Sequence, residues 1–163
     1  MAVALGTVIM ALGAIIEVVD LSLAAIASLL TVIILIEVGG GYPWLVWLGT
    51  SLATFLVFPG STVWLMYFAF GVFPILKYYI EKLKRPLWFI LKLLYVNLMA
   101  ISLIYLVELI FGLPFFEEGS LLIVKVLVYL LLIVAFFAYD RLLTLFARLY
   151  ADRLRQRFKQ LFK

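Results

Sequence analysis

Six apolar segments, each near the length of a membrane-crossing helix, make up most of this chain. A helix needs about 20 mostly apolar residues to cross the hydrocarbon core of a bilayer, within a range of about 17–25. Backbone groups in lipid must be satisfied inside a helix, and short turns rich in glycine, proline or charge separate the segments. The sequence therefore predicts an all-α, polytopic bundle of six transmembrane helices, at residues 2–19, 21–38, 42–58, 61–79, 87–111 and 121–139.

The composition excludes a soluble fold. Hydrophobic residues make up 68% of the 163 positions and charged residues 13%, whereas a soluble domain is about 45–50% apolar and about 25% charged. A small domain has too little interior to bury such an excess of apolar surface. We therefore expect this surface to face the lipid bilayer. The basic pI near 9.4 fits an anionic membrane face, and we predict no nucleic-acid partner.

The lysines and arginines predict how the chain sits in the cell membrane. Eleven of the thirteen fall into two groups, one at Lys77–Arg85 and one after residue 139. Cytoplasmic loops carry an excess of lysine and arginine. Six crossings place both groups on one side, which predicts that both termini are cytoplasmic. The other two basic residues lie inside helices, and Lys92 is expected to extend to the cytoplasmic surface.

We predict that the chain after the sixth segment, residues 140–163, continues that helix beyond the membrane domain of residues 1–139. Apolar residues recur there at steps of three and four, with Arg148 and Arg155 on the opposite face. This pattern indicates a basic amphipathic helix, which would lie on the anionic inner leaflet or bind a cytoplasmic partner. The basic loop residues Lys82, Lys84 and Arg85 have the same two expected roles.

The first segment carries small residues at four-residue spacing, in the pairs Ala2/Gly6 and Thr7/Ala11. Small residues let membrane helices approach closely. The pattern has two interpretations. The first helix packs inside the bundle, or it offers a docking face to another membrane subunit.

Ionisable groups inside membrane spans are candidates for function. Glu108 lies about 6 Å below the end of the fifth segment and Lys125 about 7.5 Å below the start of the sixth, by helical rise. The two side chains either form an ion pair or extend separately to the outer surface. The first alternative predicts an outward-facing ligand pocket between the last three helices, further lined by Trp64, Tyr67, Asn97, Tyr105 and Tyr129.

The sequence offers little support for catalysis. It has no cysteine and no histidine, and it has no nucleophile elbow, zinc-binding helix motif or phosphate-binding loop. We therefore predict that the protein is not an enzyme and needs no cofactor and no metal.

The stretch Phe70–Lys77 (FGVFPILK), with Glu81 following, resembles S-component-like membrane proteins of Gram-positive bacteria. The architecture of the whole chain resembles the S-component of energy-coupling factor transporters. That resemblance implies capture of a vitamin or metal from outside, and docking through the first helix onto a transmembrane coupling subunit driven by cytoplasmic ATPases. The family docks through an A-x-x-x-A pattern in the first helix. This chain has the pairs Ala2/Gly6 and Thr7/Ala11 in its place. No residue pattern implies a particular ligand.

A second hypothesis is a membrane scaffold of the MreD kind, with similar size and hydropathy and no small-molecule ligand. A transporter subunit would turn Glu108 and Lys125 inward, whereas a scaffold would leave them at the surface.

Overall fold

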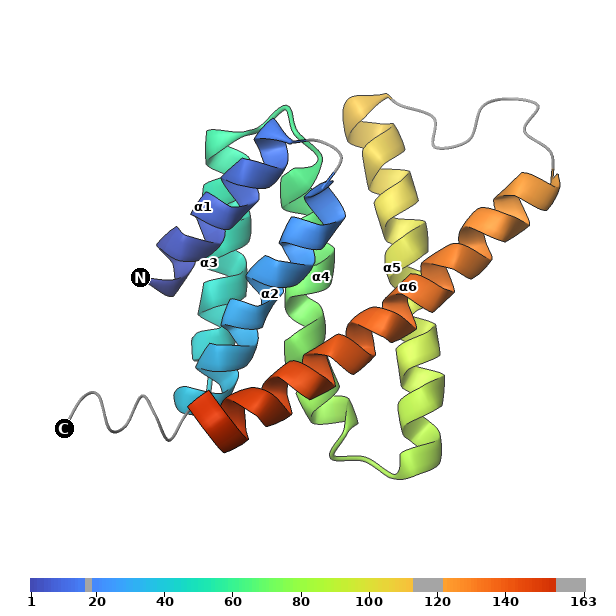
Figure 1. The fold of residues 1–163 in the computed structure, drawn as a ribbon. Coiled ribbons are helices and arrows are strands. Elements are labelled where there is room, and N and C mark those ends of the chain that lie inside the picture. Colours follow the sequence, from blue (N-terminus) through green and yellow to red (C-terminus); the bar gives the residue numbers. More distant parts are fainter. Residues whose placement is uncertain (17–18, 113–121, 155–163) are drawn as a thin grey trace. The chain divides into compact units, whose positions relative to one another are not determined.

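The computed structural model describes residues 1–16, 19–112 and 122–154. Within these ranges the chain is helical apart from short turns and has no strand, which confirms the all-α prediction (Figure 1). The helices are α1 (Ala2–Ile15), α2 (Asp20–Glu37), α3 (Tyr42–Val57), α4 (Val63–Ile80), α5 (Arg85–Phe111), α6 (Leu122–Leu149) and the π-helical turn η2 (Tyr150–Leu154).

Four helices are long and apolar enough to cross a membrane. The candidate spans are Asp20–Glu37, Val63–Ile80, Leu87–Ile110 and Val126–Asp152, the last of which runs from α6 into η2. The other two, α1 and α3, have 14 and 16 residues and are shorter than a typical span. A multi-pass membrane protein is therefore supported, whereas six crossings and the orientation of the termini remain predictions.

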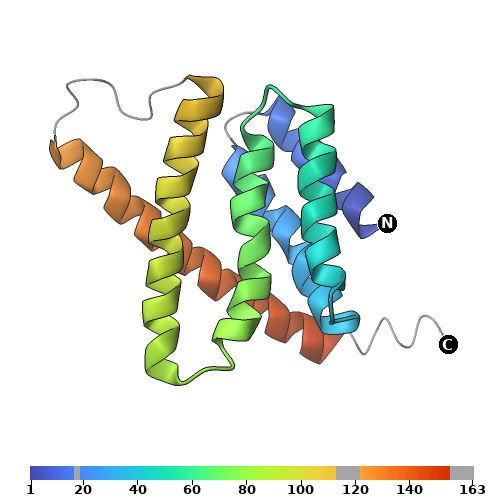
Figure 2. The same ribbon diagram turned by 180° about the vertical axis from the view of Figure 1, so that it is seen from behind.

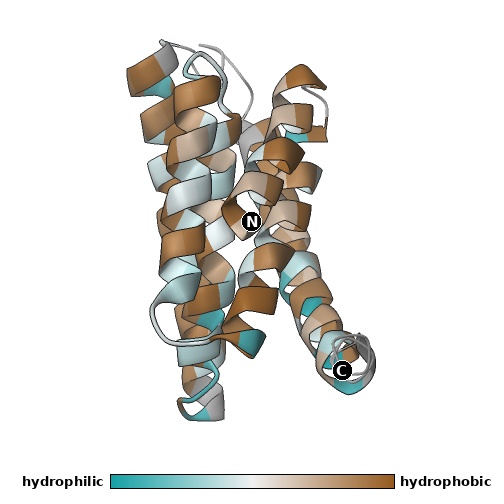
Figure 3. Ribbon diagram, turned by 90° about the vertical axis from the view of Figure 1, so that its left-hand side faces the viewer, coloured by the Kyte–Doolittle hydropathy of each residue, from teal (hydrophilic) through white to brown (hydrophobic). Residues whose placement is uncertain are grey.

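Large apolar side chains are exposed along every helix, as expected for a surface that contacts lipid. Figure 3 shows hydrophobic residues along the length of the helices. Examples, one from each helix in order, are Leu5, Ile26, Leu45, Phe68, Ile101 and Leu131.

The first helix is shorter than the sequence predicts, and the last extends beyond its predicted membrane segment. The first helix ends at Ile15 rather than at residue 19. The last does not end at residue 139 but continues without a break to Leu149, because no glycine or proline interrupts it. This agrees with the predicted continuation of the sixth helix. Of the predicted amphipathic extension, residues 140–154 are helical, and the remainder, which includes Arg155, lies outside the described residues.

The chain forms two compact units, which we describe separately. The N-terminal unit contains Met1–Tyr79 together with the chain from Leu142 onward, and the central unit contains Ile80–Arg141. The first part of α6 therefore belongs to the central unit and its last turns belong to the N-terminal unit.

In the N-terminal unit, α1 packs against both α2 and α3, which also contact each other. The first four helices lie side by side in both views (Figures 1 and 2). Gly6 is buried so closely against α3 that a Cβ there would lie 2.9 Å from Cγ2 and Oγ1 of Thr50. At Gly6 the small-residue pattern thus serves internal packing. Docking through Ala2, Thr7 and Ala11 remains a prediction.

The stretch Phe70–Lys77 forms the core of this unit. Most of its side chains are buried, and Pro74 lies inside α4. The indole Nε1 of Trp47 on α3 donates a hydrogen bond to the backbone oxygen of Phe68, at 2.9 Å. The motif-like stretch of the sequence is therefore a packing element. Its buried residues are Gly71, Val72, Phe73, Pro74, Ile75 and Lys77.

Replacing Gly71 with alanine should lower the melting temperature of the purified protein. A Cβ at this position would lie 2.9 Å from Cζ of Tyr67 and 3.0 Å from Cδ1 of Trp47. Overpacking of this kind costs about 1–3 kcal/mol, and the better helix propensity of alanine returns about 1 kcal/mol. Thermal unfolding in detergent measures the difference. The control is Gly60→Ala, where a Cβ meets nothing within 4 Å. A higher melting temperature for Gly71→Ala than for the wild type would contradict this packing.

Candidate functional site

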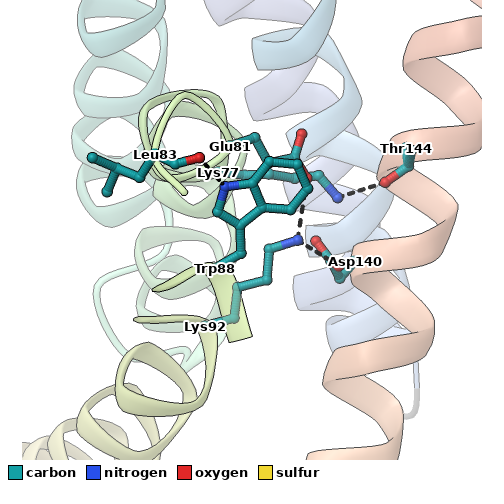
Figure 4. Close-up of polar contacts among 7 residues, drawn as sticks. All are labelled: Lys77, Glu81, Leu83, Trp88, Lys92, Asp140 and Thr144. Atoms are coloured by element: carbon teal, nitrogen blue, oxygen red, sulfur yellow. Dashed lines mark hydrogen bonds and ion pairs between the residues drawn. The ribbon is translucent and has the colours of Figure 1, made fainter. Parts of the chain in front are cut away.

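A buried lysine between two carboxylates is the strongest polar cluster of the central unit. Lys92 Nζ on α5 donates to Asp140 Oδ2 on α6 at 2.8 Å and to Glu81 Oε1, in the turn after α4, at 3.1 Å (Figure 4). Lys92 and Asp140 are each 7% exposed, whereas the Glu81 side chain is 34% exposed. We call these three residues the lysine cluster. It ties α5, α6 and the α4–α5 turn together by charge.

The prediction that Lys92 extends to the cytoplasmic surface is wrong. Its ammonium group is buried and pairs with Asp140 inside the protein. A buried charge is costly unless it is paired, and this pair meets that requirement. The sequence contained a signal for this pair. Lys92 lies five residues after the start of the predicted fifth segment, and Asp140 directly follows the sixth. The depth argument that joined Glu108 to Lys125 also places these two residues near the same end of neighbouring helices.

The α4–α5 turn is held by a further contact. The indole Nε1 of Trp88 donates to the backbone oxygen of Leu83 at 2.8 Å. Together with the Glu81–Lys92 pair, this bond fixes both ends of the turn to α5 (Figure 4). Lys82 and Lys84 are exposed on the turn. Arg85 begins α5, and its side chain lies outside the described part of the protein.

Two residues of the predicted outer pocket contact each other. Tyr129 on α6 donates through its hydroxyl to Asn97 Oδ1 on α5, at 2.5 Å. Asn97 Nδ2 in turn donates to the backbone oxygen of Leu93 at 2.8 Å. The side-chain amide of Asn97 on α5 therefore has a side-chain partner on α6, within the central unit.

Two further pocket residues lie on α5, where Tyr105 is 65% exposed and Glu108 is also exposed. Their spacing from Asn97, eight and eleven residues, places all three on one side of the helix. Lys125 lies on α6, but its side chain is outside the described residues. The Glu108–Lys125 ion pair therefore remains a prediction.

The two remaining pocket residues belong to the N-terminal unit. Tyr67 is fully buried, with its hydroxyl 3.4 Å from Oγ1 of Thr31. The ring of Trp64 packs edge-on against Phe55, with centroids 5.0 Å apart. The burial of Tyr67 assigns it to the core of this unit. A pocket that combines these residues with the α5 residues remains a prediction.

The other predicted contact residues are basic. Arg148 is exposed in the last turn of α6. In the N-terminal unit, Lys77 is buried and donates from Nζ to Oγ1 of Thr144 at 2.7 Å (Figure 4). Across the described ranges, no three acidic side chains are grouped so as to hold a metal ion.

The helices define the class of protein. Four apolar helices of sufficient length and an apolar exterior place the chain among multi-pass helical membrane proteins. Comparison with protein-family models, curated proteins and solved structures finds no match. Arguments about its function therefore depend on its own residues.

Proposed function

We propose that this chain is a non-enzymatic membrane subunit that captures a small, vitamin-like molecule for uptake. One observation carries the proposal. Asn97, Tyr105 and Glu108 form a polar line along the largely apolar part of α5 that follows Lys92, and Tyr105 is largely exposed. We call these three residues the α5 stripe.

Polar and ionisable side chains within a span are costly in lipid and usually face a cavity, a ligand or a partner. The α5 stripe offers an amide, a phenol and a carboxylate. The hydroxyl of Tyr129 adds a further polar group, because it hydrogen-bonds to Asn97, the first residue of the stripe. A few polar groups and aromatic rings among apolar surroundings suit a small molecule that combines a flat ring with hydrogen-bonding groups. The resemblance to S-components supports the same proposal.

The exposure of the stripe also favours a second candidate, a membrane scaffold or assembly subunit. Tyr105 and Glu108 are open to a neighbouring helix, and polar side chains hold membrane helices together. In this case the stripe would contact another protein rather than a ligand.

A screen of vitamins and cofactors against the purified protein in detergent tests the first candidate. One compound should stabilise the protein, by about 2.7 kcal/mol when present at 100 times its Kd. Tyr105→Ala and Glu108→Gln should weaken that stabilisation. Ile101→Ala, at another exposed position on α5, should leave it unchanged.

The two candidate functions predict different results in the ligand screen and in co-purification. If no compound shifts the melting temperature, the capture function is wrong. If a membrane protein instead co-purifies with the wild type but not with Tyr105→Ala, the scaffold function is supported.

A further inference from the structure

The turn Glu81–Lys84 is basic, largely exposed and held by hydrogen bonds and an ion pair. Lys82 and Lys84 flank Leu83, whose side chain is 49% exposed. Leu83 donates its backbone N–H to the backbone oxygen of Ile80 at 3.0 Å, and its own backbone oxygen accepts the Trp88 indole bond. The Glu81–Lys92 pair holds the start of the turn.

We propose that this turn is a preformed binding site for the headgroup of an anionic phospholipid. Lys82 and Lys84 would contact the phosphate, and Leu83 would enter the apolar region below it. The proposal depends on the protein lying in a membrane. It does not depend on what the α5 stripe binds.

The position of the turn supports a lipid partner. The apolar stretch of α4 ends at Ile80 and that of α5 begins at Leu87, so in a membrane crossed by both helices the turn would lie where they leave the hydrocarbon. Lipid headgroups occupy this level, and tryptophan is enriched there. Basic residues beside a membrane helix attract anionic lipid, on the order of five-fold in affinity for each residue. An exposed leucine between two lysines is suited to a surface with phosphate above and acyl chains below.

The contacts that hold the turn assign a role to Trp88. A loose turn would lose conformational freedom on binding, and fixing the backbone in advance removes that cost. The Trp88 indole bond fixes the carbonyl of Leu83, between the two lysines. Trp88 therefore acts as a positioning residue, because it orders the turn through the backbone of Leu83.

Native mass spectrometry of the full chain in detergent tests the site with phosphatidylglycerol and phosphatidylcholine of identical acyl chains. The wild type should prefer phosphatidylglycerol. The double variant Lys82→Gln/Lys84→Gln should lose about 30-fold of that preference, or about five-fold for each lysine. Trp88→Phe keeps the charges and an aromatic ring but removes the indole donor. It should weaken the preference several-fold while melting close to the wild type.

Arg141→Gln is the control, because Arg141 is an exposed basic residue on α6 to which no lipid contact is assigned. Its preference should match that of the wild type. Equal binding of the two lipids by the wild type would overturn the site, and so would an unchanged preference in the double lysine variant. An equal loss in Arg141→Gln would show general attraction and would also overturn the site. An unchanged preference in Trp88→Phe would remove the role of Trp88.

Discussion

Replacing Lys92 with methionine should destabilise the protein by about 3–5 kcal/mol, the cost of removing one partner of a buried ion pair. Methionine fills a similar volume, so the loss of stability comes from removing the positive charge of Lys92. Asp140 would keep its negative charge at 7% exposure without the ammonium group 2.8 Å away. Glu81 is more exposed and would retain part of its hydration. Chemical unfolding in detergent, followed by circular dichroism, measures the effect.

Two variants separate this charge effect from a packing effect. In Lys92→Met/Asp140→Asn the stranded charge is also removed, so much of the lost stability should return. Lys84→Met removes an exposed lysine from the same region and should change stability by less than about 0.5 kcal/mol. If Lys92→Met were as stable as the wild type, the lysine cluster would not hold the central unit together.

The sequence predicted the helices well because a lipid environment restricts an apolar segment to helical structure. A long apolar segment in a membrane must satisfy its own hydrogen bonds, so it becomes a helix. Segment length and the positions of glycine and proline then set most boundaries, as at Tyr42 and at Gly112. No such signal occurs at residue 139, where an aspartate and an arginine follow an apolar run, and the sequence predicts that the helix continues beyond the membrane segment there. Charge alone does not stop a helix, and α6 continues to Leu149.

The direction in which each side chain points was harder to predict. In a soluble helix the apolar face marks the core, but in a membrane helix both the core face and the lipid face are apolar. Tyr67 and Tyr105 therefore look alike in the sequence. The structure buries Tyr67 fully and leaves Tyr105 65% exposed. The predicted pocket combined residues of both kinds for this reason.

Buried pairs between distant segments were only partly predictable. The need of Asn97 for a partner followed from its polarity, but its contact with Tyr129 depends on how α5 and α6 meet. The pairing of Lys92 with Asp140 depends on the same geometry. The expected depth of a polar residue in the membrane limits which residues can pair with it. Which of these residues it contacts depends on how the helices pack.

Replacing Phe73 with alanine should destabilise the protein by about 3–5 kcal/mol, the usual cost of truncating a buried aromatic side chain. Phe73 is fully buried at the centre of the stretch Phe70–Lys77, in the N-terminal unit. Its neighbours can fill only part of the cavity, since Pro74 limits how α4 adjusts. Phe73→Leu fills more of the space and should lose less. Leu45→Ala, at an exposed position on α3, should be close to neutral because detergent replaces the lost side chain. Unfolding in detergent compares the three variants, and equal losses for Phe73→Ala and Leu45→Ala would show that this stretch is not the core. Lys92→Met tests the central unit in the same assay, so the pair of results would show whether charge in one unit and packing in the other contribute comparably to stability.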